Sequence, residues 1–173
     1  DDAFPRAGIG NQYHAQCLIN RAFLAENLKN YDLIVYGGEW DQIENYGYLD
    51  DVISLLEYTL ASSDAEVILM TTPIKFTPQS VERATYFSDG ARLTGRAEHE
   101  AQLERIHDSF KAFAAGHARV HFWDREMIFG DNPTVSPEGW PYSLDGGHVS
   151  IYGSLQAAET FIAREKSIPV LTN

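Results

Sequence analysis

The apolar residues of this chain occur in two spacings that alternate along the sequence. Short continuous apolar runs at 33–36 and 67–70 are bounded by polar or turn-forming residues, a pattern typical of strands buried on both faces. A third strand is predicted at 120–122, Val-His-Phe. Around them, apolar residues recur every three or four positions, which predicts amphipathic helices. Strands that alternate with helices indicate a parallel sheet with helices on both of its faces.

Four segments carry the helical spacing. They span 12–30, 49–60, 98–115 and the stretch that follows Ser150, whose hydroxyl is placed to cap the last helix. The second of these helices is expected to point its apolar face into the core. The apolar residues of the four helices are, in chain order, Leu18, Ile19, Ala22, Phe23, Val52, Ile53, Leu56, Leu60, Leu103, Ile106, Phe110, Phe113, Leu155, Ala158, Phe161 and Ile162.

Length and charge narrow the classes of function. The chain has 173 residues, enough for a domain with a sizeable core, and we assign residues 1–173 to one domain. It has 25 acidic and 13 basic residues and a formal net charge of -12. This charge argues against nucleic acid or an anionic membrane surface as a partner, because both require basic patches. It is compatible with a neutral ligand such as a sugar.

The remaining composition predicts neither a cofactor nor a metal site. The single cysteine, Cys17, excludes a disulfide within the chain. His99 and His107 are eight positions apart on one predicted helix, too far for the usual one-turn pair of metal ligands. No apolar run approaches the roughly 20 residues of a membrane-spanning helix.

Ligands of such sheets bind at the carboxyl ends of the strands. Gly37 and Gly38 follow the first predicted strand, Thr71-Thr72 the second and Trp123-Asp124 the third. The two glycines are candidate donors of backbone N–H groups to an oxyanion; the alternative is a simple turn that ends the strand. Three aromatic residues are candidates for contact with a sugar: Trp40, Trp140 and Tyr142. The alternative is that these side chains only pack at the bases of loops.

The pair with the clearest chemistry is Asp145 and His148. The acid precedes the histidine by three residues, two glycines lie between them, and a predicted helix follows at once. In a Ser-His-Asp system the histidine takes a proton from the nucleophile, while the acid orients the ring and stabilises its cation. The alternative interpretation is a turn at the entry of a helix, in which Asp145 accepts backbone hydrogen bonds.

Residues 141–154, Pro-Tyr-Ser-Leu-Asp-Gly-Gly-His-Val-Ser-Ile-Tyr-Gly-Ser, resemble the last block of the SGNH hydrolase superfamily. They are most similar to the SGNH domain fused to bacterial membrane O-acyltransferases, where the block reads Tyr-x-Asp-x-x-His-Leu-Ser-x-x-Gly. Segments 32–40, 67–73 and 120–124 resemble successive strands of that domain in the same order. The resemblance implies a flavodoxin-like three-layer sandwich, with Asp145 and His148 as two members of a catalytic triad.

The chain also departs from that family. The nucleophilic Ser of the family lies in a Gly-Asp-Ser block after the first strand, and no segment here matches that block. The position of the other blocks would put it before residue 1, so we expect the first strand and the nucleophile to lie outside these residues. Glu39 and Trp40 occupy the region of the usual Gly-x-Asn-Asp block.

The resemblance implies acyl transfer or ester hydrolysis on an O-acylated carbohydrate of the cell envelope, with a carbohydrate and an acyl donor as substrates. It implies a periplasmic or other extracytoplasmic domain of an inner-membrane protein. The expected partner is an upstream chain or a fused membrane acyltransferase domain. Two alternatives stay open, a non-catalytic SGNH-like domain that binds a glycan and an unrelated flavodoxin-like binding domain. The sequence does not indicate an oligomeric state.

Overall fold

The computed structural model describes residues 14–38, 40, 43, 47–72, 77, 97–124 and 148–164. Within them, helices and strands alternate as the apolar spacing predicts, with ends that differ from the predicted ones by a few residues at most. The elements are α1 (His14–Asn27), the short 3-10 helix η1 (Leu28–Asn30), β1 (Leu33–Tyr36), α3 (Leu49–Ser62), β2 (Glu66–Met70), α5 (Ala97–Ala115), β3 (Val120–Trp123) and α7 (Ile151–Arg164).

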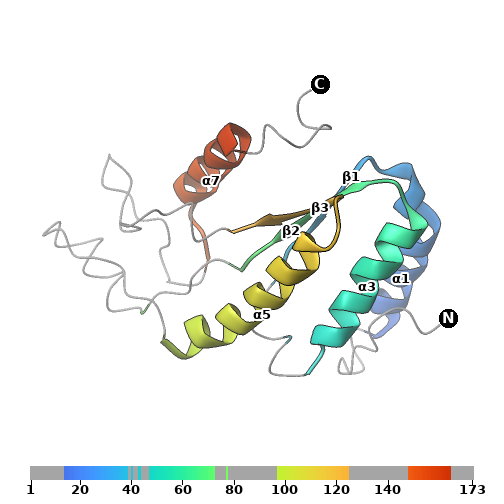
Figure 1. Cartoon of the computed structure of the whole chain (residues 1–173), viewed down its shortest axis with the longest axis horizontal. Coiled ribbons are helices and arrows are strands. Elements are labelled where there is room, and N and C mark those ends of the chain that lie inside the picture. The colour runs from blue at the N-terminus through green and yellow to red at the C-terminus, as the bar shows by residue number, and fades with distance from the viewer. Residues whose placement is uncertain are drawn as a thin grey trace, which may run out of the picture.

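The three strands form a parallel sheet in the order β1-β2-β3. Leu33 lies opposite Glu66, and Val67 lies opposite Val120, so all three strands run in register toward one edge. Helices α3 and α5 lie on one side of the sheet and α7 lies on the other (Figure 1). The three layers and the parallel sheet confirm the predicted flavodoxin-like α/β architecture.

The main core lies between the sheet and the helices α3 and α5. Side chains alternate across a strand, so Val67 and Leu69 of β2 face this layer, where they are 1% and 0% exposed. The predicted inward residues of α3 pack here, and so does the apolar stripe of α5. The buried members of this core are Trp40, Val52, Leu56, Val67, Leu69, Leu103, Ile106, Phe110 and Val120.

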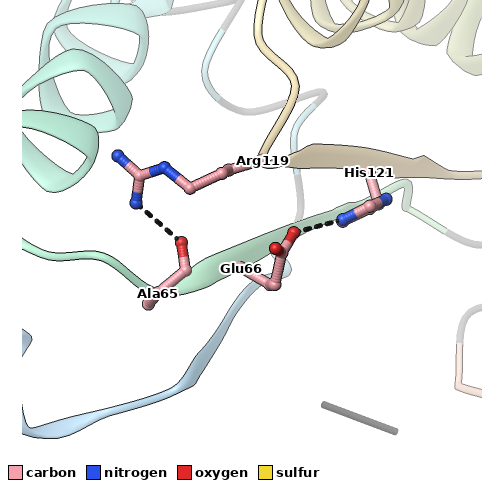
Figure 2. A network of polar contacts seen from close by, with 4 residues as sticks. All are labelled: Ala65, Glu66, Arg119 and His121. Atoms are coloured by element: carbon pink, nitrogen blue, oxygen red, sulfur yellow. Dashed lines mark hydrogen bonds and ion pairs between the residues drawn. The ribbon is translucent and has the colours of Figure 1, made fainter. Parts of the chain in front are cut away.

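Polar contacts hold the amino ends of β2 and β3 to the end of α3. The guanidinium of Arg119 donates hydrogen bonds to the carbonyl oxygens of Leu60 (2.7 Å), Ser63 (2.7 Å) and Ala65 (3.0 Å), which satisfies carbonyls that a helix end leaves without partners. Next to it, Nε2 of His121 lies 2.6 Å from Oε2 of Glu66, across the two strands (Figure 2). These contacts fix the end of the sheet that is opposite the candidate site.

One edge of the sheet and parts of two helices remain open among the described residues. There, β1 pairs only with β2, and Val35 of β1 is 50% exposed. The apolar face of α1 is largely uncovered among these residues, and that of α7 is covered only in part, where Ala157 and Phe161 pack near Trp123. Their most exposed apolar side chains are Leu18, Ile19 and Phe23 on α1 and Ile151, Leu155 and Ile162 on α7. The described part of the chain therefore presents a flavodoxin-like sheet that lacks a strand next to β1.

Candidate active site

The carboxyl ends of the three strands form the edge at which the candidate residues meet. Beyond β1 lie Gly37 and Gly38, beyond β2 lie Thr71 and Thr72, and beyond β3 lies Asp124. The ends of β2 and β3 are joined by a hydrogen bond from the backbone N–H of Thr71 to the carbonyl oxygen of Trp123 (3.0 Å). Such an edge is where ligands bind in open α/β sheets.

Ser150 caps helix α7, as its position before the helix predicts. Its Oγ accepts a hydrogen bond from the backbone N–H of Gly153 (3.1 Å), and its carbonyl oxygen accepts one from the N–H of Ser154 (2.8 Å). Both contacts satisfy helix N-terminal donors and begin the helical ladder. The serine after the histidine therefore has a structural partner and is not a good candidate for the nucleophile.

His148 lies two residues before this cap, with its side chain exposed. Its neighbour Val149 packs on the same apolar cluster as Trp123, the last residue of β3. The ring of Trp123 also contacts that of Phe161, with 4.2 Å between the ring centroids. Helix α7 is thereby fixed to β3, and its start lies on the side toward which the strands run (Figure 1). A histidine that must contact a substrate requires such an accessible position.

Gly37 and Gly38 lie at the end of β1 and are exposed. Gly37 lies against the side chain of Met70, since a Cβ added at Gly37 would be 2.6 Å from Cε of that methionine. The carbonyl oxygen of Gly38 accepts a hydrogen bond from Oγ1 of Thr72 (2.7 Å). The two glycines therefore expose backbone at the carboxyl edge, while their other side is held by residues at the end of β2.

Trp40, one of the predicted sugar contacts, lies in the core. Its side chain is 6% exposed, and its ring packs edge-on against Phe110 of α5 with centroids 5.1 Å apart. The indole Nε1–H donates to the carbonyl oxygen of Met70 (2.6 Å). Burial is favourable here because the polar tip of the ring finds an acceptor at the end of β2. Trp40 is a core residue at the base of the loop, which is the alternative stated above.

Thr72 is the residue at this edge whose role the sequence did not indicate. It is 1% exposed, and its hydroxyl accepts from the backbone N–H of Trp40 (2.8 Å) while it donates to Gly38. The only signal was a hydroxyl side chain directly after a buried strand, which is common at strand ends. Three predicted site residues, Asp145, Trp140 and Tyr142, lie outside the described residues.

The described residues also bear on two other features, a metal site and a membrane-spanning helix. Among the described residues, no three His, Cys, Asp or Glu side chains are grouped so that they could hold a metal ion. None of the helices in this part of the chain is both long and apolar enough to span a membrane.

Comparison with known proteins defines the relationship of the chain. A solved structure from Streptococcus pneumonia, described provisionally as a platelet activating factor, is similar over 85% of this chain and 67% of that chain, with a TM-score of 0.54 and 16% identity. This likeness supports the fold. Among curated proteins, no sequence matched. Residues 4–163 match the family model described as the SGNH domain fused to AT3 domains. The chain therefore belongs to this SGNH domain family.

Proposed function

We propose that this chain carries the acid–base half of a Ser-His-Asp centre for acyl transfer or ester hydrolysis on an O-acylated carbohydrate of the cell envelope. The observation that carries the proposal is the position of His148. Its exposed side chain precedes α7 near the carboxyl edge of a parallel sheet, in a chain whose family is the SGNH domain.

In the proposed reaction, a serine outside these residues attacks the carbonyl carbon of the ester. His148 takes the proton of the serine hydroxyl as the new C–O bond forms, and gives it to the sugar oxygen as the old C–O bond breaks. Water or a second hydroxyl then attacks the acyl-serine, again through His148, and regenerates the serine. Asp145 orients the imidazole and stabilises its cation. Backbone N–H groups at Gly37 and Gly38 stabilise the negative oxygen of the tetrahedral intermediate.

The serine is proposed to come on a strand that pairs with the open edge of β1. A parallel strand there would end beside Gly37 and Gly38, at the edge that also receives the start of α7. The half-exposed Val35 and the uncovered face of α1 support this position, because open edges and apolar faces are normally paired or covered. The expected source is an upstream segment or the fused membrane acyltransferase domain, on the extracytoplasmic side of an inner membrane. The family description names fusion to AT3 domains.

Of the three aromatic residues that the sequence suggested as sugar contacts, two remain in the proposal. Trp140 and Tyr142 keep this role as a proposal, while Trp40 loses it because it is buried in the core. The substrates are then a carbohydrate ester or acyl acceptor next to these rings and an acyl donor. The centre as proposed requires no cofactor.

Substitution of His148 tests the proposal. In the polypeptide that also carries the serine, we expect His148→Ala to lower kcat for a small acetyl ester by about 10³-fold or more, as removal of a triad member does. His117→Ala is the matched control, because His117 bonds the end of α5 through Nδ1 and Phe113 O (2.8 Å), at the opposite end of the strands. Equal activity of the His148→Ala protein and the wild type would contradict the catalytic role.

A non-catalytic glycan-binding domain is the second candidate. It is favoured by one observation, since Glu39-Trp40 stands where the family has Asn-Asp, so the Asn side chain of that block is missing. In that case, calorimetry with an acetylated oligosaccharide would show binding without release of acetate. Release of acetate that depends on His148 would exclude this candidate.

A further inference from the structure

We propose that Thr72 is a positioning residue for the backbone of Gly37 and Gly38, the proposed oxyanion-binding segment. This inference rests on the proposed function, because the segment has a catalytic role only if an acyl group is transferred. Thr72 itself is buried and would touch neither the substrate nor the reacting atoms.

The hydroxyl of Thr72 determines how the Gly38 peptide is oriented. A backbone N–H can only donate, so the bond from Trp40 N to Oγ1 (2.8 Å) makes the hydroxyl oxygen an acceptor there. The single hydroxyl proton is then available for the carbonyl oxygen of Gly38 (2.7 Å). One side chain of β2's end thus bridges two backbone groups of the segment after β1. Because a peptide unit is planar, holding this carbonyl fixes the plane of the unit that joins Gly38 to residue 39, and thereby restrains the backbone directly after the N–H of Gly38.

Trp40 provides a second connection between the same two strand ends. Its indole N–H bonds to the carbonyl oxygen of Met70 (2.6 Å), and its ring packs on Phe110. The segment from Gly37 to Trp40 is therefore held at two places on the end of β2, at Met70 and at Thr72. Both connections are made by groups that the core buries.

The glycines themselves require such support. Without a Cβ, glycine backbone adopts many conformations, whereas oxyanion donors act only when they are held where the charge develops. A displacement of about 1 Å can cost about 10²-fold in rate. Gly37 and Gly38 are exposed, but the groups that hold them are almost fully buried. We therefore assign the rigidity of the segment to Thr72 and Trp40.

The test compares three variants of the polypeptide that also carries the serine. Thr72→Val keeps the shape of the side chain but removes the hydroxyl, and Thr72→Ser keeps the hydroxyl. Thr59→Val is the matched control, because Thr59 is also fully buried and its hydroxyl also has two partners, Tyr36 OH (2.6 Å) and Leu55 O (2.9 Å), but it lies on α3. The readouts are kcat and KM for a small acetyl ester and amide hydrogen exchange at Trp40, whose N–H donates to Thr72.

We expect Thr72→Val to lower kcat by about 10-fold or more, with a small change in KM, because donors aimed at the transition state are displaced. Exchange at the amide of Trp40 should become faster, because its N–H loses the acceptor. Thr72→Ser should restore kcat to within a few-fold, and Thr59→Val should lower thermal stability but not the kcat of the folded protein.

Two failures are distinguishable. If the wild type turns over the ester through His148 but Thr72→Val has an unchanged kcat, or Thr59→Val loses as much, Thr72 has no positioning role and the proposed function stands. If the wild type shows no turnover that depends on His148, the proposed function fails and the role of Thr72 fails with it.

Discussion

At the scale of single residues, the partners of a side chain decide between interpretations that its chemistry leaves open. Trp40 has a flat face that suits a sugar and a polar tip that suits the base of a loop. The free carbonyl of Met70 and the ring of Phe110 select the second role. Neither partner is close to Trp40 in sequence, so the sequence pattern could not distinguish a sugar contact from a core residue. Ser150 was predictable because its partner, Gly153, lies three residues away.

Tyr36 offers a pH-dependent test at this scale. Burial raises the pKa of the Tyr36 phenol above its ordinary value of 10.0, although the hydrogen bond with Thr59 acts in the opposite direction. A raised pKa means that the folded state favours the protonated phenol. The resulting stability is complete below pH 10.0 and is lost as the pH rises through the pKa of the folded state.

We therefore expect the free energy of unfolding of the wild type to fall more steeply than that of Tyr36→Phe as the pH rises above about 10. Urea titrations at several pH values measure this difference. The phenylalanine variant should start lower, by about 1 kcal/mol, because it lacks the bond to Thr59. Parallel pH dependence of the two proteins would contradict the assignment.

At the scale of elements, the spacing of apolar residues predicted which segments form helices and strands and which face of each is apolar. The stripe of α5 illustrates this, since Leu103, Ile106 and Phe110 are 1%, 0% and 0% exposed. The same spacing on α1 and α7 also formed helices, yet Phe23 and Leu155 are 52% and 59% exposed. A helical pattern shows that a face needs cover, but the element that covers it is distant in sequence and is not encoded in the spacing.

The capping of α7 gives the prediction at this scale. Ser150→Ala removes the acceptor for the N–H of Gly153, and we expect a loss of about 1 kcal/mol in the free energy of unfolding. Ser150→Asp is the matched variant, because aspartate also accepts that bond and is favourable near a helix N-terminus. Urea unfolding measures both. Equal loss in the two variants would mean that the hydroxyl acts by some route other than capping.

At the scale of the whole molecule, the described residues leave one boundary of the fold open. The core between the sheet and α3 and α5 is closed, whereas the outer edge of β1 has no pairing strand and the apolar face of α1 is largely exposed among the described residues. This asymmetry agrees with the position at which the proposed serine-bearing strand would pair. In the sequence, only the order of the family blocks indicated that a strand is missing next to β1. The alternation of strands and helices did not, because it is the same with or without a further strand.

Self-association is the consequence that can be measured. Open strand edges pair with other chains, and a lysine on the edge opposes this. We expect the 173-residue chain to associate through β1, and Val35→Lys to shift it toward the monomer in sedimentation velocity. Glu57→Gln, on the solvent side of α3, is a control that makes the same change in net charge. The edge would be excluded as the cause if both variants shifted the equilibrium equally.

The central claim is that Asp145 and His148 act as one unit on an external serine, and a double-substitution experiment tests it most directly. In the polypeptide that carries the serine, kcat for a small acetyl ester is measured for Asp145→Asn, His148→Ala and the protein with both changes. We expect each single change to cost about 10³-fold or more, and the double change to cost no more than His148→Ala alone, because triad members are not additive. The claim would be contradicted if the losses in kcat from the two single changes multiplied in the double variant. It would also be contradicted if Asp145→Asn caused no loss in kcat.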